Sequence, residues 1–376
     1  MNLYSYPYLI QKEILNHLSI NQLFFLSLCS KNTKHFIKQT QKHQLEKCKR
    51  VIYSVNDMIV MRISVKMADD RFRSNLIYLC KSTDELPKWM ITDSLQEVRV
   101  NVLATPIDFF RSTTKDSELH AKYSPDTFES MLESIHNQLY DLLGNHTKFW
   151  MQSFDYDRGE GTHFLPLLHN IEKIDIFGKG FESTKIDEFL DRSTCLEHFA
   201  FGTVHDHPNR LREDSKLYDL DTVYVYSAFV CACPMANDVL KRFKGRHAFL
   251  DSGDIKTADV IQFLNEWKSG EKFKNLELIS MDYRFNLQEI RSSVEVKEID
   301  TEVKYSFVTR FNKRNPHFGQ LDAGEFKSPC YMVRESDGRV ASVMLSEFTI
   351  YMGVWDMTEK EFLIKFDKSI NAVPFL

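Results

Sequence analysis

Apolar residues recur at helical spacing in three short segments between residues 7 and 38. Pro7 suits the first turn of a helix because its missing N–H would have no partner there. Ser19 and Gln22 form a capping-box pair for a second helix, and Ser30 can cap a third. The apolar positions of the first two segments are Ile10, Ile14, Leu15, Leu18, Leu23, Phe24 and Leu26. This pattern predicts three short helices.

Three helices of this size cannot bury all their apolar side chains among themselves, because so small a domain is marginal alone. One interpretation is that an unburied apolar patch marks a protein partner. The other is that the helices dock on the rest of the chain, which periodicity alone favours. In that second case the apolar faces of residues 9–28 would be buried against residues 51–140.

The hydrophobic period changes to two at Val51, which begins an alternating segment that ends at an Asn56-Asp57 turn. A second alternating segment, 59–65, follows the turn, so the two predict a β-hairpin. Residues 98–102 alternate in the same way and predict another strand of the same sheet. Ser124 and Pro125 then precede a helical pattern that Gly144 ends. Residues 51–145 are therefore expected to form a small antiparallel sheet with one helix.

A pattern of apolar-x-x-apolar-x-apolar begins at residues 171, 196, 220, 246, 273 and 296. Of its 18 positions 15 are apolar, and the exceptions are Arg246, Asp251 and Thr301. Helix-period stretches lie between triplets, at 186–190, 236–243 and 260–267. A strand and a helix every ~25 residues predict a leucine-rich-repeat-like α/β solenoid whose parallel strands line one face. The segment 202–219 lacks a helical period and is expected to be a polar loop.

Asp337-Gly338 lies between two alternating segments and gives the strongest short hairpin signal in the chain. A final strand is expected from Phe348 toward Trp355. The sequence thus predicts an α/β protein with three N-terminal helices, a small antiparallel sheet, a leucine-rich-repeat-like solenoid and a C-terminal β-hairpin.

Hydrophobic residues make up 43% of the 376 residues and charged residues 27%, which is typical of a folded protein rather than a disordered one. The net charge of −5 is unevenly distributed. Residues 1–50 hold eight of the 48 basic and two of the 53 acidic residues, which leaves 40 basic and 51 acidic residues elsewhere. Lys31, Lys34, Lys38 and Lys42 share one helical face. That face could hold nucleic acid, but the absence of interleaved aromatic residues favours an acidic neighbour.

The compartment is expected to be cytoplasmic or nuclear. Apolar runs such as 23–29 fall well short of the ~20 residues that a bilayer-crossing helix needs. Gln11, Lys12 and Glu13 interrupt the apolar stretch that a secretory signal would require. The seven cysteines are scattered and odd in number, so they do not indicate a disulfide framework.

His205, His207, Cys231 and Cys233 could together offer a zinc site. Their spacing lacks the usual Cys-x2-Cys pair, so a polar loop beside buried thiols is the favoured interpretation. A metal-dependent enzyme that uses these four residues stays the weaker alternative. No phosphate-binding loop, dinucleotide motif or nucleophile elbow is found in the chain, and we expect no catalysis and no cofactor.

The N-terminal residues carry a resemblance to a known family. Tyr6-Pro7, Ile10, Ile14-Leu15, Leu18, Leu23 and the run from Ser27 to Lys31 resemble an F-box. An F-box attaches a substrate receptor to the Skp adaptor of a cullin-RING ubiquitin ligase. The run LSLCSKNTKHFIK, residues 26–38, is similar to nematode F-box families.

The C-terminal region resembles the type 2 F-box-associated region of nematode F-box proteins. The likeness lies in residues 263–281 and 331–355. The residues that carry it are Phe263, Leu264, Trp267, Gly270, Leu276, Glu277, Arg334, Asp337, Gly338 and Ala341.

The resemblance implies the substrate-recognition subunit of an SCF-type ubiquitin ligase, without catalytic residues of its own. It implies adaptor binding by Pro7, Ile10, Ile14, Leu15, Leu18 and Leu23. The expected partners are the Skp-family adaptor, cullin through it, and a target protein, with no nucleic acid or membrane.

The expected domains are residues 1–50 as F-box and helical linker, 51–145 as sheet and helix, and 146–376 as substrate-binding region. The alternative of a different class is a non-enzymatic solenoid scaffold or ligand-binding protein without adaptor binding.

Overall fold

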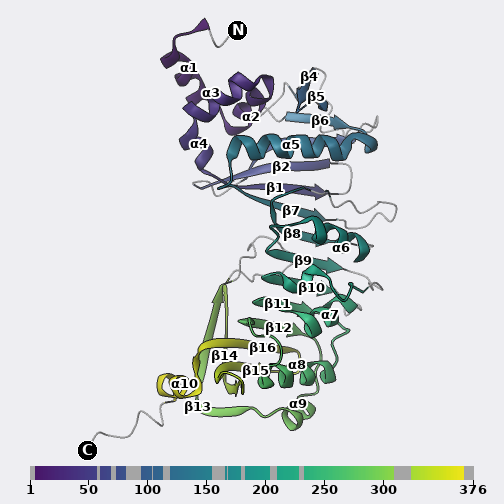
Figure 1. Ribbon diagram of the computed structural model, residues 1–376, viewed down its shortest axis with the longest axis vertical. Helices are drawn as coiled ribbons and strands as arrows, with labels where there is room; N and C mark the ends of the chain where they lie inside the picture. The colour runs from purple at the N-terminus through teal and green to yellow at the C-terminus, as the bar shows by residue number, and fades with distance from the viewer. Residues whose placement is uncertain are drawn as a thin grey trace, which may run out of the picture. The chain divides into compact units, whose positions relative to one another are not determined.

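The computed structural model is a mixed α/β structure (Figure 1). It describes residues 5–56, 60–68, 73–81, 95–103, 105–112, 119–154, 166, 168–178, 183–203, 210–227, 233–308 and 323–367. The chain divides into two compact units: unit 1 comprises residues 1–175 and 192–196, and unit 2 comprises residues 176–191 and 197–376. Among the described helices, none is long and apolar enough to cross a membrane.

Unit 1 begins with the three predicted helices and adds a short fourth. They are α1 (Tyr8–Asn16), α2 (Ile20–Cys29), α3 (Lys31–Thr40) and α4 (Lys42–Glu46). The predicted caps are present: the Ser19 backbone N–H donates to Gln22 Oε1 at 3.0 Å, and the Ser30 hydroxyl accepts from the Thr33 N–H at 3.0 Å. Both contacts satisfy donors at helix starts that would otherwise have no partner.

The sheet of unit 1 contains the predicted hairpin and strand. Its order is β7 (Lys148–Phe154), β1 (Cys48–Asn56), β2 (Val60–Met67), β3 (Arg73–Lys81), β6 (Leu119–Tyr123), β5 (Thr105–Ser112) and β4 (Leu95–Val102). The expectation of an antiparallel sheet over residues 51–145 is wrong for one pair, because β3 pairs in parallel with β6. β7 lies beyond that range and pairs in parallel with β1. Local periodicity identifies a strand but carries no information on its distant neighbour.

Helix α5 (Phe128–Leu143) confirms the helix predicted between Ser124 and Gly144. A 3-10 turn, Pro125–Thr127, leads into it, and Gly144 ends it with φ 81°. Its apolar face is buried, and His136 on that face makes a 2.8 Å hydrogen bond with the Tyr53 hydroxyl of β1. Burial lowers the pKa of His136 to about 3, so the imidazole is neutral.

Unit 2 contains four parallel strands in consecutive order. They are β9 (His198–Thr203), β10 (Thr222–Ser227), β11 (His247–Asp251) and β12 (Leu278–Asp282). The predicted helices are present as α6 (Ser183–Arg192), α7 (Pro234–Arg242) and α8 (Thr257–Ser269), and α9 (Leu287–Ser293) follows. Figure 1 shows α7 and α8 on one side of these strands. The strand β8 (Ile171–Phe177) spans the boundary of the units.

The strand register corrects two predicted triplets. Val223 of β10 is aligned with Phe199 of β9 and Ala248 of β11, and Ala248 with Ile279 of β12. These aligned residues occupy the second apolar position of the pattern, three residues after its start. The third and fourth strands therefore place the start of the pattern at residues 245 and 276, where the sequence predicted 246 and 273. The aligned residues are 24, 25 and 31 residues apart. The last interval is longer because it contains α8, so a prediction based on nearly constant spacing misplaces the strand that follows this helix.

Antiparallel strands complete unit 2. They are β13 (Lys297–Val308), β14 (Ala323–Val333), β15 (Arg339–Leu345) and β16 (Thr349–Thr358), and α10 (Glu359–Phe366) follows them. The Asp337-Gly338 hairpin is confirmed, and Gly338 has φ 72°. The sixth repeat at 296 is wrong, since β13 pairs antiparallel with β14. Of the predicted loop 202–219, residues 204–209 lie outside the described residues, and Lys216–Asp219 form a 3-10 turn.

Candidate functional site

The first turn of α1 presents apolar side chains to solvent. Four of the seven large hydrophobic residues that are exposed in the described part of the chain lie between residues 6 and 10. We call Tyr6, Tyr8, Leu9 and Ile10 the α1 patch. Leu9 is 74% exposed and Ile10 is 47% exposed. An apolar group of this kind, at one end of a folded unit, is typical of a protein-binding surface.

Local contacts fix the position of the α1 patch. The N–H groups of Ile10 and Gln11 donate to the Pro7 carbonyl at 2.9 and 3.0 Å, so the helix begins at the proline as expected. The Gln11 amide also donates to the Tyr6 carbonyl at 2.6 Å. Tyr8 packs edge-to-face on Phe36 of α3, with ring centroids 5.9 Å apart. The patch is therefore held on a formed helix.

The six residues predicted to bind an adaptor differ in exposure. Pro7 and Ile10 are exposed, and Ile14 and Leu18 are half-buried. Leu15 and Leu23 are both 0% exposed. In this structure these two leucines pack inside unit 1 and present no surface to a partner.

Helix α2 docks on the rest of unit 1, whereas the α1 patch does not. Leu23, Phe24 and Leu28 are buried, and α2 packs on α5, β3 and β4. The Gln138 amide of α5 donates to the Ser27 carbonyl and hydroxyl at 3.1 and 3.2 Å. The expectation that residues 9–28 would be covered by residues 51–140 therefore holds for α2 and fails for the start of α1.

Part of the basic face of α3 pairs with α5. Lys38 lies 2.8 Å from Asp141, and Lys34 forms an ion pair with the same carboxylate. Lys34 also donates to Gln138 Oε1 at 3.2 Å. Although burial alone would raise the pKa of Asp141, hydrogen bonds from the two lysines hold it below its usual range. Lys42 lies 3.8 Å from Glu46, so the acidic neighbour expected for this face is intramolecular for three of its four lysines.

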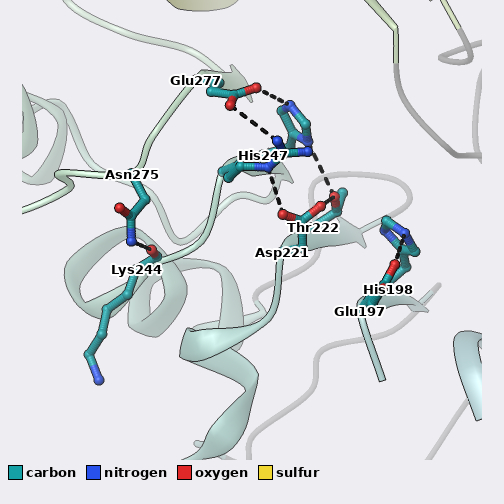
Figure 2. A network of polar contacts seen from close by, with 9 residues as sticks. Glu197, His198, Asp221, Thr222, Lys244, His247, Asn275 and Glu277 are labelled. Atoms are coloured by element: carbon teal, nitrogen blue, oxygen red, sulfur yellow. Dashed lines mark hydrogen bonds and ion pairs between the residues drawn. The ribbon is translucent and has the colours of Figure 1, made fainter. Parts of the chain in front are cut away.

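Figure 2 shows polar residues at the N-terminal edge of the parallel strands in unit 2. His247 lies 3.3 Å from Glu277, and its Nδ1 lies 3.3 Å from the Thr222 hydroxyl. Arg246 lies 2.7 Å from Asp221 and 3.3 Å from Glu277. Burial lowers the pKa of His247. Each of these carboxylates has a cationic or imidazole partner, so this edge is electrostatically balanced.

The opposite, C-terminal edge of the same strands carries two carboxylates side by side. Asp251 of β11 is aligned with Asp282 of β12. Tyr226 is aligned with Asp251 and Thr349 with Asp282. Burial, then the Asp282 charge, raises the pKa of Asp251 to about 7, and burial raises that of Asp282. We call Tyr226, Asp251, Asp282 and Thr349 the acidic row.

Sequence reasoning missed the acidic row. A signal was present, because Asp251 was one of three polar exceptions in the predicted apolar repeat. The corrected register explains this exception: Leu250 is the apolar position, and Asp251 follows it on the other face of the sheet.

The predicted zinc residues are only partly described. His205, His207 and Cys231 lie outside the described residues. Cys233 is buried, which raises the pKa of its thiol to about 12. Across the residues that the structure describes, no group of three metal-binding side chains is found.

Comparisons with known proteins concern the N-terminal helices. The family model for the F-box domain matches residues 7–45, which extend from Pro7 into α4. None of the curated proteins and none of the solved structures matches the chain. F-box domains bind Skp-family adaptors within SCF complexes. The match supports the identification of this chain as an F-box protein.

Proposed function

We propose that this protein is the substrate-recognition subunit of an SCF-type, cullin-RING ubiquitin ligase. The observation that carries the proposal is the exposed α1 patch at the start of the segment that matches the F-box domain. The patch is apolar and sits on a formed helix, as an adaptor-binding surface requires.

The predicted adaptor-binding residues take two roles in this proposal. Pro7, Ile10, Ile14 and Leu18 are accessible or half-buried and contact the adaptor, together with Tyr8 and Leu9 of the α1 patch. Leu15 and Leu23 are buried and act indirectly, because they hold α1 and α2 in place. Substitution of the buried pair would therefore test folding before it tested binding.

The functional division follows the three expected segments. Residues 1–50 bind the adaptor, 51–145 support the helices of the F-box, and 146–376 bind a target protein. The protein performs no covalent chemistry and requires no cofactor. Its contribution is proximity, since holding the target near a ubiquitin-loaded enzyme makes the attack of a target lysine effectively intramolecular.

The substrate-binding region is proposed to be leucine-rich-repeat-like and of the nematode type 2 F-box-associated kind. Parallel strands alternating with helices support the first assignment. The second is supported by four residues of the likeness that meet in space: Trp267, Gly270, Arg334 and Asp337. The Arg334 guanidinium lies 5.4 Å from the Trp267 ring centroid and pairs with Asp337 at 2.7 Å.

Gly270 completes this contact. It has φ 78°, and a Cβ at this position would come within 1.9 Å of the Ser336 hydroxyl oxygen. Arg334 also donates to the carbonyls of Phe273 and Lys274 at 3.5 and 3.4 Å. The residues of the likeness thus join α8 to the β14–β15 hairpin and have a shared structural reason to occur together.

Co-expression of the full chain with a Skp-family adaptor, followed by size-exclusion chromatography, tests the proposal. We expect one peak that contains both proteins. Separate elution of two folded proteins would contradict adaptor binding. We place the complex in the cytoplasm or nucleus, where fractionation of expressing cells would locate it.

The burial of α2 favours one alternative, a solenoid scaffold or ligand-binding protein without adaptor binding. In that case α1 and α2 only cap unit 1, and the folded chain would elute apart from the adaptor. For the metal-dependent alternative, stoichiometric zinc in the purified full chain would be the positive result.

A further inference from the structure

A cavity of about 490 Å³ lies in unit 2, at the turns that follow α7 and α8. Three aromatic residues line it: Tyr218, Phe243 and Phe273 are only 2%, 3% and 5% exposed. The charged residues of its wall are two carboxylates, Glu213 and Glu271, and five cations: Lys241, Arg242, Lys244, Lys272 and Lys274. We call this cavity the basic pocket. Its size and its buried aromatic residues are typical of a ligand-binding site.

Backbone contacts hold the turns that form the basic pocket. The Lys244 N–H donates to the Tyr218 carbonyl at 2.7 Å, and the Asn275 amide donates to the Lys244 carbonyl at 3.0 Å (Figure 2). Phe273 has φ 58°, which is uncommon for a bulky side chain. Arg334 stabilises this turn, because it donates to the Phe273 carbonyl at 3.5 Å. The pocket is therefore formed before a ligand binds, which lowers the entropic cost of binding.

Four of the five cations of the basic pocket have carboxylate partners. The pairs are Lys241–Asp259 at 3.0 Å, Arg242–Glu213 at 3.1 Å, Arg242–Asp238 at 3.5 Å, Lys244–Asp219 at 2.8 Å and Lys272–Glu266 at 2.9 Å. The four cationic side chains are between 34% and 69% exposed. Exposed ion pairs contribute only ~0–1 kcal/mol each, so a carboxylate of a ligand can replace the protein's own carboxylate at little cost.

Lys274 is the fifth cation, and it differs from the other four. Its side chain is exposed and forms no ion pair with any residue that the structure describes. Its backbone is fixed, because Arg334 donates to the Lys274 carbonyl at 3.4 Å. The ammonium group is thus held at the pocket wall and is available to a ligand. An anionic oxygen accepts charge-assisted hydrogen bonds from such a group, and these are about twice as strong as neutral ones.

The composition of the wall determines the sign of the ligand. Five cations against two carboxylates favour an anionic ligand and disfavour a cationic one, because like charges across an interface repel. The buried aromatic residues exclude water from one side of the pocket, which strengthens an ion pair formed there.

We propose that the basic pocket binds an anionic side chain of the target protein, with Lys274 as its principal partner. The target class is then a protein with an exposed acidic segment, whose anionic group is a carboxylate or a phosphate. This inference rests on the proposed function, because it assigns a target-binding surface to the ligase subunit.

The test uses the full chain and six-residue peptides in which serine alternates with glutamate, phosphoserine or lysine. Each peptide carries a fluorescent dye without net charge, and fluorescence anisotropy at about pH 7.5 and ~0.15 M salt measures binding. We expect the glutamate peptide, the phosphoserine peptide or both to bind, and the lysine peptide not to bind. The peptide that binds more tightly identifies the anionic group as a carboxylate or a phosphate.

Lys274→Glu should lower the affinity for the anionic peptide by about tenfold or more, whereas Lys274→Arg should keep it within about twofold. The matched control is Lys360→Glu, which makes the same change in charge at an exposed lysine of α10. It should change the affinity by less than about twofold. If Lys274→Glu does not fold, Lys274→Gln replaces it.

Three results would overturn the proposal. They are equal losses of affinity in Lys274→Glu and Lys360→Glu, no binding of either anionic peptide, and equal binding of the lysine peptide.

Adaptor co-elution of each variant separates this inference from the proposed function. Loss of peptide binding in Lys274→Glu with intact co-elution supports the basic pocket as a target surface. Intact co-elution with unchanged peptide binding rejects the basic pocket alone, whereas failed co-elution of every protein, wild type included, rejects the ligase assignment.

Discussion

At the scale of single residues, Arg334 connects two distant parts of unit 2. Arg334 is only 2% exposed, and the partners of its side chain are Asp337, the Trp267 ring and two backbone carbonyls. Its hydrogen bonds lower the pKa of Asp337. A lysine could supply the charge at this position but not the planar, two-pronged geometry.

Arg334→Ala is expected to lower the free energy of unfolding by ~3 kcal/mol, because it leaves buried acceptors without a donor. Arg334→Lys should recover less than half of that loss. Arg339→Ala is the control, since Arg339 is exposed in the same hairpin and pairs with Asp337 at 3.6 Å. Denaturant titration would contradict this account if the two alanine variants were equally stable.

The raised pKa of Asp251 predicts that the stability of the fold depends on pH. Its pKa is about 7 in the folded state, above the ordinary value of 3.8, so the unfolded chain releases this proton at lower pH. The stability contributed by protonated Asp251 is therefore fully present below the pKa of the unfolded chain. It is lost as pH rises through the pKa of the folded state.

Asp251→Asn removes this loss. At about pH 8 the variant should exceed the wild type in the free energy of unfolding by ~1 kcal/mol, a figure reduced because the group is partly solvent-exposed. At about pH 4 the difference should be near zero. Thermal unfolding at both pH values measures it, with Asp300→Asn as the exposed control. A difference of the same size at both pH values would show that charge is not the cause.

At the scale of elements, contacts with α5 determine how α2 and α3 are held. The Gln138 amide donates to the Ser27 carbonyl, and Lys34 and Lys38 pair with Asp141. Buried polar contacts of this kind set the position of a helix, since their loss leaves groups without partners.

Gln138→Ala is expected to cost ~1–3 kcal/mol in the stability of unit 1. Amide hydrogen exchange in residues 20–40 should become about tenfold faster, because the local opening free energy falls. Asn137→Ala, one residue away and only half-buried, should leave exchange unchanged. If amide exchange in residues 20–40 of the Gln138→Ala variant were as slow as in the wild type, the anchoring role of this side chain would be contradicted.

Elements with a local chemical signal could be predicted from the sequence. Ser124, Pro125 and Gly144 marked both ends of α5, and Asp337-Gly338 marked a hairpin. Pairing between distant strands could not be predicted, because the period of a strand does not identify its neighbour. The parallel β3–β6 pair and the antiparallel β13 are the examples.

The burial of the candidate adaptor residues could also be predicted only in part. Helical spacing assigned Ile14 and Leu15 to the apolar face of the first helix, but it could not tell which of the two adjacent residues is buried. The structure buries Leu15 and leaves Ile14 half-exposed. The acidic row depends on the register of four strands, β10, β11, β12 and β16, and could not be derived from local spacing.

At the scale of the whole molecule, the two ends of the chain differ in charge and in the surfaces they expose. Residues 1–50 have an excess of basic residues and carry the exposed α1 patch near their start, whereas the remainder of the chain holds 51 acidic against 40 basic residues.

Adaptor affinity of the full chain tests whether the α1 patch is the adaptor-binding surface. We compare the wild type with Leu9→Asp/Ile10→Asp, which alters the α1 patch, and with Leu103→Asp, which alters an apolar residue that is 53% exposed elsewhere in unit 1. All three should have similar melting temperatures, because the altered side chains are exposed.

We expect the wild type and Leu103→Asp to bind a Skp-family adaptor equally well. Leu9→Asp/Ile10→Asp should weaken binding by about 100-fold, as expected for two apolar contacts at the centre of an interface. Equal affinity of all three proteins would show that the adaptor binds elsewhere. Absence of binding by the folded wild type would contradict the ligase assignment itself.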